Sequence, residues 1–233
     1  MQEILKVLVG SRAHGLADEN SDYDYRAVFL TPTRELLSVG NKPVNSTWIE
    51  GNEDNTAWEL KHFLSMALQN NPTVLEVFVA PIEVKTYFGE VLRNLLPNII
   101  NPKLLLNSHL GYAKNQKNKL LAGDWDLNKD RKSRKYTSAW LRVTYQALHY
   151  FRHGEYIIDF RNTEVYKNLL DIRTSKDYTQ GEAVNLCNYY EGLLLEFRDY
   201  VNDKKADLEL VNDFVISVRK ANLLAEEGEF RDG

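Results

Sequence analysis

The stretch VLVGSRAHGLADENSDYDYRAVFL, residues 7–30, raises the first question about fold and chemistry. One apolar run ends at Gly10-Ser11, and a second, β-branched and aromatic run begins around Asp22 and Asp24. Residues two positions apart on a strand point to the same face, so these two carboxylates lie together. Two negative charges on a half-buried sheet are costly unless a cation lies between them. The stretch therefore predicts a metal ion held beside a phosphate.

The glycine and serine supply the phosphate part of this prediction. Glycine lets the backbone approach a phosphate closely, and the amides and hydroxyl that follow it can bind phosphate oxygens at a helix N-terminus. A tight turn between a strand and a helix would use Gly10 and Ser11 equally well. The segment is not a P-loop, because Leu16-Ala17 stands where that motif requires Lys followed by Ser or Thr.

The aspartates supply the metal part. Mg²⁺ prefers hard oxygen ligands, typically one or two carboxylates together with phosphate oxygens and water. The alternative is a turn at Ser21-Asp22 followed by Asp24 facing solvent. Because the pair follows Gly-Ser at this distance along the chain, the metal interpretation is favoured.

Composition narrows the class of protein. The 233 residues carry a formal net charge of −4, which argues against a strongly cationic coat for nucleic acid but leaves room for a local basic groove. Cys187 is the only cysteine, so a disulfide framework is excluded. No apolar run approaches the roughly 20 residues that span a bilayer, and the N-terminus lacks the features of a signal peptide. We expect a cytoplasmic protein without a membrane partner.

The pattern along the chain predicts an α+β fold. Short strands are expected at 4–9 and 23–30, an irregular polar region at 40–55, and a helix at 61–69. From about residue 83 onward the apolar spacing is helical, with a capping box at Thr179 and Glu182 and a last helix over 208–225. We expect a small mixed-sheet domain, residues 1–100, followed by an all-helical domain, residues 101–233.

Basic residues also gather in the helical half. Lys135, Arg142 and His149 recur at seven-residue spacing and so share one helix face. Residues 129–134 form a basic segment that we expect to be a loop. Such a loop is solvated by default, and the alternative is a contact with the backbone of an RNA or another anionic acceptor.

Three motifs together resemble a known superfamily. They are Gly10-Ser11 followed by Gly15, Ser21-Asp22-Tyr23-Asp24-Tyr25-Arg26, and Asn71-Pro72-Thr73-Val74-Leu75-Glu76. This combination is similar to the DNA polymerase beta superfamily of nucleotidyltransferases, and more narrowly to its branch associated in places with RNA repair. The resemblance covers most of the first 80 residues strongly and the helical remainder weakly. It implies a polymerase-beta-like catalytic domain, with the helical domain closing the cleft for nucleotide and acceptor.

The resemblance implies roles for matching residues. Gly10 and Ser11 would hold a nucleoside triphosphate, with ATP expected first, while Asp22 and Asp24 would bind Mg²⁺, with Mn²⁺ as an alternative. Arg26 would neutralise the carboxylate pair or touch phosphate, although an ion pair that supports the strand is an equal alternative.

Superfamily members also use a third carboxylate from a neighbouring strand, as a metal ligand or as the base for the attacking hydroxyl. The first candidate is Glu59, which follows a strand-like run and precedes a helix; Asp54 is second and Glu76 third. For Glu59, an exposed position in the first turn of a helix is the alternative.

A nucleotide contact is also implied for Lys135 and Arg142. Related sequences carry a Lys-x3-His-x2-Arg pattern here, but this chain has Ala139 at the histidine position. The departure weakens a base-reading role and leaves contact with the triphosphate as the expectation.

The implied activity is transfer of a nucleoside monophosphate from an NTP to an acceptor hydroxyl, with release of pyrophosphate. An RNA end is the first acceptor expected, and a protein or a small molecule fits the wider superfamily. The alternatives are a nucleotide-sensing or partner-binding module without turnover, and an antitoxin-like modifier of a partner protein. If a phage encodes the chain, the expected compartment is the host cytoplasm. Nothing in the sequence predicts the oligomeric state.

Overall fold

The computed structural model describes residues 1–40, 44–48, 55–123, 131–174 and 179–229. The chain divides into two compact units, of which the first consists of Met1–Ala13, Glu19–Ile100 and Lys205–Gly233. The second consists of His14–Asp18 and Asn101–Lys204. One division between the units falls after Ile100, at the boundary expected between domains 1–100 and 101–233, and the domain assignment stays a prediction. Two segments depart from it, because the C-terminal segment belongs to the first unit and residues 14–18 belong to the second.

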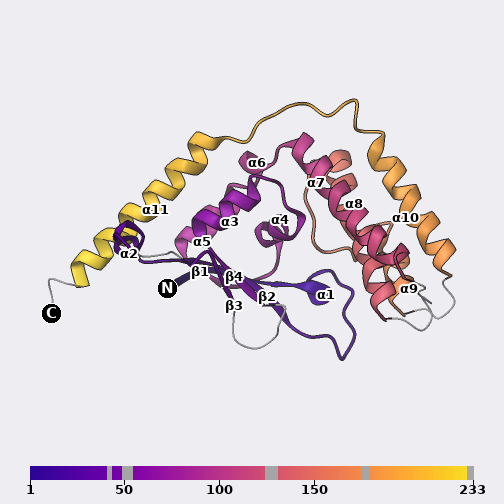
Figure 1. Ribbon diagram of the computed structural model, residues 1–233, viewed down its shortest axis with the longest axis horizontal. Helices are drawn as coiled ribbons and strands as arrows, with labels where there is room; N and C mark the ends of the chain where they lie inside the picture. Colours follow the sequence, from indigo (N-terminus) through magenta and orange to yellow (C-terminus); the bar gives the residue numbers. More distant parts are fainter. Residues whose placement is uncertain (41–43, 49–54, 124–130, 175–178, 230–233) are drawn as a thin grey trace. The chain divides into compact units, whose positions relative to one another are not determined.

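The first unit contains the strands and several short helices (Figure 1). In chain order its elements are β1 (Gln2–Val9), α1 (Gly10–Ala13), β2 (Asp24–Leu30), α2 (Thr33–Leu37), β3 (Ser46–Trp48), β4 (Thr56–Glu59), α3 (Leu60–Ala67), α4 (Pro72–Val79), β5 (Ile82–Lys85), α5 (Tyr87–Asn94), α6 (Leu96–Ile99) and α11 (Leu208–Glu229). The second unit contains α7 (Pro102–Leu121), α8 (Arg131–His153), α9 (Tyr166–Thr174) and α10 (Gln180–Leu195). The predicted α+β fold, a small mixed sheet followed by a mainly helical region, is confirmed.

The sheet has the strand order β3-β4-β2-β1-β5. β1 pairs antiparallel with β2 and β5, β3 pairs antiparallel with β4, and β2 pairs parallel with β4. Helices α3, α4 and α5 lie on one side of the sheet (Figure 1). On that side Trp58 of β4 packs against Phe63 of α3, which packs in turn on Phe78 of α4, with ring centroids 6.1 and 5.2 Å apart. These contacts hold the helical layer on the sheet.

Local signals account for most helix starts. The side chain of Asn71 accepts a hydrogen bond from the Thr73 amide at 3.0 Å, and Pro72 occupies the first turn of α4. The predicted capping box at Thr179 and Glu182 opens α10 and is confirmed.

Two short strands escaped the sequence prediction. β5 lies at an edge of the sheet and all four of its residues are exposed, so it lacks the apolar alternation of a half-buried strand. β3 lies in the polar region expected to be irregular and pairs only with β4. Both are edge strands, whose pairing depends on a neighbour rather than on their own composition.

The second unit is built around α8, which packs against α7, α9 and α10. Its buried core includes Trp140, Leu141 and Leu148. His109 of α7 is fully buried: its Nδ1 donates to the Leu105 carbonyl at 2.8 Å, and its Nε2 accepts from the Tyr156 hydroxyl at 2.9 Å. His109 is therefore a core residue of the second unit.

The basic segment expected to be a loop needs a correction. Residues 131–134 form the first turn of α8, while residues 129 and 130 lie outside the described residues. Among the helices of the described ranges, none is long and apolar enough to cross a bilayer.

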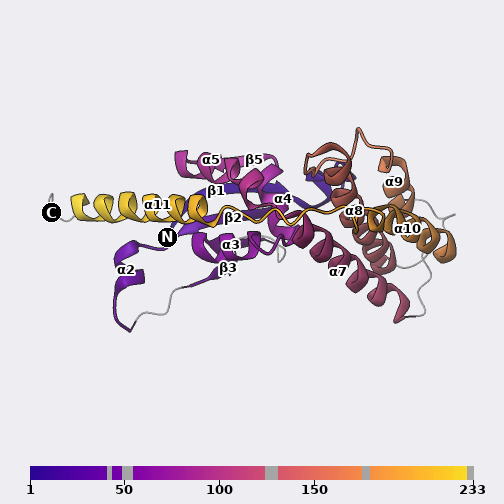
Figure 2. The ribbon, with the colours of Figure 1, turned by 90° about the horizontal axis from the view of Figure 1, so that it is seen from above.

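Helix α11 returns to the first unit and packs on α2, α3 and α6, and Figure 2 shows its course from above. The N-terminus of α2 has no side-chain cap of its own, and the Thr33 amide donates instead to Asn222 at 2.9 Å and to Glu226 at 2.7 Å. One helix therefore satisfies amides at the start of another that lies nearly 190 residues away in sequence.

An ion pair reinforces this contact. Arg219 of α11 donates to the Thr31 carbonyl at 2.8 Å and pairs with the carboxylate of Glu59, whose side chain is only 5% exposed. Removing only the arginine of such a pair is strongly destabilising, because the carboxylate is left buried without its counter-charge.

We predict that Arg219→Ala lowers the free energy of unfolding by about 3 kcal/mol, because it removes the counter-charge of a buried carboxylate. Urea unfolding followed by circular dichroism measures the change. The control is Arg198→Ala, at an exposed position, with an expected change under about 0.5 kcal/mol. Equal stabilities of the two variants would contradict the structural role of the pair.

Candidate metal and nucleotide site

The pairing of β1 with β2 brings the two N-terminal motifs together. Val9, the last residue of β1, lies opposite Asp24, the first residue of β2. Gly10 and Ser11 follow directly in α1. The phosphate motif and one of the two aspartates therefore meet at the same end of the sheet.

Gly10 is required where it meets Asp24. Its backbone has φ +68°, a left-handed conformation that favours glycine, and a Cβ atom built there would collide with the Asp24 carboxylate. Asp24 thus lies directly against a bare stretch of backbone. This arrangement fits a ligand that needs close approach to main-chain amides and a carboxylate at once.

Arg12 closes the loop between the two motifs and was missed in the sequence prediction. Its guanidinium donates to the Ser21 carbonyl from Nε at 3.1 Å and from Nη2 at 2.7 Å, and lies 3.9 Å from the ring centre of Tyr23. Asp22, which is exposed, stands between these two anchored residues. The position of Arg12 directly after Gly10-Ser11 was the only signal in the sequence for its role.

Asp24 shares its face of the sheet with Arg26, as expected from their spacing. The Arg26 guanidinium lies 5.3 Å from the ring centre of Trp58, on the side covered by α3 and α4. A cation two residues from Asp24 can offset the negative charge there.

Tyr25 follows Asp24 in β2 and points to the other face of the sheet. Its amide donates to the side-chain oxygen of Asn55 at 2.7 Å, and Lys6 lies 4.7 Å from its ring centre. Burial, and then the charges of Glu83 and Tyr23, raise the pKa of Tyr25, so its phenol stays protonated at neutral pH.

The prediction that Glu59 joins the two aspartates needs correction. Phe29, not Asp24, is the β2 partner of Glu59, which places Glu59 five positions further along, about 16 Å at the usual rise of a strand. Glu59 also follows Trp58 in sequence and so points to the opposite face of the sheet from Asp24.

The side chain of Glu59 has a structural role instead. It caps α3 by accepting from the Lys61 amide at 2.8 Å and pairs with Arg219. The alternative of an exposed glutamate in a first helical turn is also wrong, because Glu59 is buried.

The other two candidates for the third carboxylate remain predictions. Asp54, which directly precedes Asn55 in sequence, lies outside the described residues. Glu76 is buried within α4. Within the described ranges, no group of three or more Asp, Glu, His or Cys side chains is arranged to hold a metal ion.

The middle of the loop between the motifs belongs to the second unit. Gly15 has φ +73°, and a Cβ there would press on the side chain of Arg161. Its carbonyl accepts a hydrogen bond from the Tyr166 hydroxyl at 3.1 Å, and His14 is buried with its ring edge-on to Phe160, 6.1 Å between centres. His14 is therefore a buried residue that packs against Phe160.

Lys135 and Arg142 lie on α8 in the second unit, so their predicted contact with nucleotide stays a prediction. Arg173 of α9 lies near Arg142: burial and the charges of Arg131 and Arg142 lower the pKa of Arg173, while Asp18 opposes that change. An arginine remains protonated at neutral pH despite such a change. Sequence spacing could not find Arg173, because it lies on a different helix.

The arrangement of the sheet and of its two N-terminal motifs fits the fold of the polymerase beta superfamily of nucleotidyltransferases. Residues 2–211 match the family described as the RNA repair pathway DNA polymerase beta family, RlaP. Because the match covers most of the chain, this protein belongs to that family.

One curated relative is an uncharacterised 38.9 kDa protein encoded in the nrdC–mobD intergenic region of Enterobacteria phage T4. The two are 29% identical over 131 residues, which is 51% of this chain and 39% of the phage protein. The chain therefore aligns with well under half of that relative. No solved structure shows significant similarity to this chain.

We predict that Gly10→Ala destabilises the fold much more than Gly40→Ala. Both glycines have positive φ, but a Cβ at Gly40 meets nothing within 4 Å, whereas one at Gly10 collides with Asp24. The expected loss is about 1 kcal/mol for Gly40→Ala and at least about 2 kcal/mol for Gly10→Ala, measured by urea unfolding. Equal losses would show that Asp24 does not lie against Gly10.

Proposed function

We propose that this protein transfers a nucleoside monophosphate from an NTP, ATP first, to a hydroxyl at an RNA end and releases pyrophosphate. The observation that carries the proposal is the contact between the bare backbone at Gly10 and the carboxylate of Asp24. It joins a surface suited to phosphate oxygens with a ligand suited to a divalent cation. Membership of a family named for RNA repair supports RNA as the acceptor.

The residues present fit a hard divalent cation. Asp22 and Asp24 offer carboxylate oxygens, the donors that Mg²⁺ and Mn²⁺ prefer, and the triphosphate would complete the set with its own oxygens. When bound, the cation would polarise the α-phosphate and offset charge on the leaving pyrophosphate.

The chain's own groups would position the triphosphate. The amide and hydroxyl of Ser11, next to Gly10, would donate to its oxygens. Arg12 would hold the loop that carries Asp22, through the Ser21 carbonyl. Lys135 and Arg142 remain proposed contacts for the triphosphate.

The reaction forms one bond and breaks one. The acceptor oxygen bonds to the α-phosphorus, and the bond from that phosphorus to the oxygen bridging to the β-phosphate breaks. The acceptor proton passes to a carboxylate or to water, and pyrophosphate leaves with the bridging oxygen.

A nucleotide-sensing module without turnover is the second candidate. The position of Glu59 favours it, because the described part of the site holds two carboxylates and Glu59 is engaged elsewhere. Two carboxylates can bind a metal–nucleotide complex without activating an acceptor. Protein and small-molecule acceptors, including an antitoxin-like modification of a partner, stay open as variants of the transfer reaction.

Label transfer separates these candidates. Each α-³²P-labelled NTP is incubated with Mg²⁺ or Mn²⁺ and with total RNA or cytoplasmic protein, beside an Asp22→Ala, Asp24→Ala variant. We expect label in RNA, from ATP above all, and at least about a hundredfold less with the variant, because the metal ligands are lost. Label in protein alone would overturn RNA as the acceptor, and NTP binding without transfer would favour the sensing module.

The third carboxylate is tested by isosteric changes at the three candidate positions. We expect Asp54→Asn or Glu76→Gln to reduce transfer at least about a hundredfold with NTP binding retained, since neither change alters side-chain size greatly. Glu59→Gln is the control, and its transfer rate per folded molecule should change less than about threefold. A selective loss of transfer in Glu59→Gln would contradict the position assigned to Glu59.

A further inference from the structure

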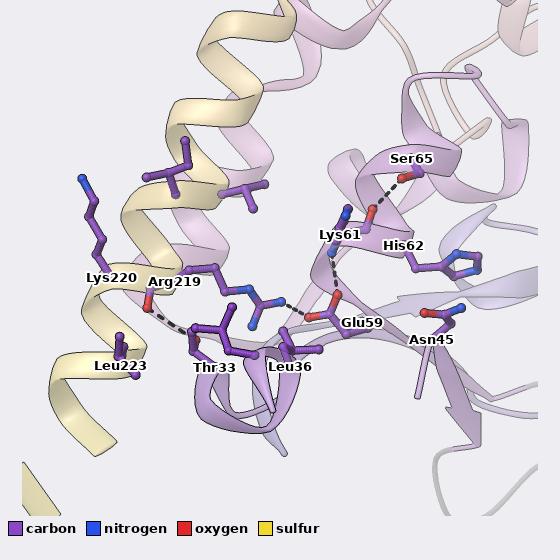
Figure 3. A pocket seen from close by; sticks show the side chains of 13 residues that line it. Thr33, Leu36, Asn45, Glu59, Lys61, His62, Ser65, Arg219, Lys220 and Leu223 are labelled. Atoms are coloured by element: carbon purple, nitrogen blue, oxygen red, sulfur yellow. Dashed lines mark hydrogen bonds and ion pairs between the residues drawn. The ribbon is translucent and has the colours of Figure 1, made fainter. Parts of the chain in front are cut away.

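A cavity lies in the first unit, at the end of β4 remote from Asp24. Its volume is about 700 Å³, and α2, α3 and α11 form its walls (Figure 3). Pockets that hold small molecules typically have volumes of about 300–1,000 Å³. The cavity is therefore large enough for an organic ligand.

Two of the walls are largely apolar. They contain Leu36 and Leu37 of α2, and Val215, Ile216 and Leu223 of α11. Leu37 is 73% exposed and Ile216 48% exposed, so covering them with a ligand would remove considerable apolar surface from water.

The third wall is polar. It is formed by Lys61, His62 and Ser65 of α3, with Asn45 beside them (Figure 3). The Ser65 hydroxyl donates to the Lys61 carbonyl at 2.8 Å. A ligand would therefore meet hydrocarbon on two sides and polar groups on the third.

The charge balance of the lining is positive. Among the described residues that line the cavity, Glu59 is the only carboxylate, and Arg219 pairs with it. Lys61 and Lys220 give this described part of the lining an excess of two positive charges. A bound anion would therefore be favoured over a bound cation.

We propose that this cavity binds a small amphipathic anion, with an apolar ring or chain between α2 and α11 and a sulfonate, carboxylate or phosphate head at Lys61. It is separate from the metal and nucleotide site, because Glu59 and Asp24 lie about 16 Å apart along the sheet. The α11 wall also lies beyond residues 2–211, the part matched by the family. The proposal thus stands independently of nucleotidyl transfer.

Fluorescence titration with two probes tests the proposal on the full chain. The anionic probe is 1-anilinonaphthalene-8-sulfonate, and the uncharged probe is N-phenyl-1-naphthylamine, which has the same rings without the sulfonate. We expect one saturable site for the anion. Lys61→Ala should weaken the anion about tenfold and leave the uncharged probe unchanged, because only the anion uses the charge. Lys103→Ala, at an exposed position on α7, is the control and should alter neither.

Filling the cavity provides the steric test. Ile216→Trp and Ser65→Phe add bulk from opposite walls, and each should weaken the anion at least about tenfold. Leu224→Trp is the matched control, on the same helix, exposed and outside the lining, and should change nothing. Circular dichroism checks that each variant folds, and either filled wall suffices for the test.

Three results would overturn the proposal. One is equal binding by the Ile216→Trp, Ser65→Phe and Leu224→Trp variants, which would indicate adhesion to exposed apolar side chains. Another is binding without saturation at one equivalent. The third is an equal effect of Lys61→Ala on both probes, which would remove the anion from the proposal.

Discussion

The pairing of Val9 with Asp24 is the constraint on which the candidate site depends. It places the end of β1 beside the start of β2, so that Gly10 lies against the Asp24 carboxylate. A one-residue slip would turn Asp24 to the other face and leave Gly10 without its neighbour. The buried valines of β1 and the buried end of β2 hold this register, because a slip would expose them. The packing of these residues in the core therefore also fixes the geometry of the candidate site.

Much of the fold and of the candidate site could be predicted from the sequence because the signals for both are local. Gly10 and Ser11 follow directly after β1, Asp24 opens β2, and Asn71 and Thr179 cap the helices that follow them. Each signal lies within a few residues of the structure that it predicts. The family match confirms the class of protein, while the roles of individual residues in the site remain to be measured.

Long-range packing explains what could not be predicted. Glu59 ends a strand and begins a helix, and sequence alone does not show which face of the sheet it takes or that Arg219, 160 residues later, pairs with it. The return of α11 to the first unit and the packing of Gly15 beside Arg161 have the same character. These contacts join segments that are far apart in the sequence, and the composition of one segment does not indicate which other segment it will contact.

The most direct measurement is the crystal structure of the protein with Mn²⁺ and a non-hydrolysable ATP analogue, with manganese located by its anomalous scattering. The account predicts manganese bound by the carboxylates of Asp22 and Asp24, at about 2.1 Å, with the triphosphate at the amides of Gly10 and Ser11. Manganese and nucleotide bound elsewhere, with these four residues uninvolved, would contradict it.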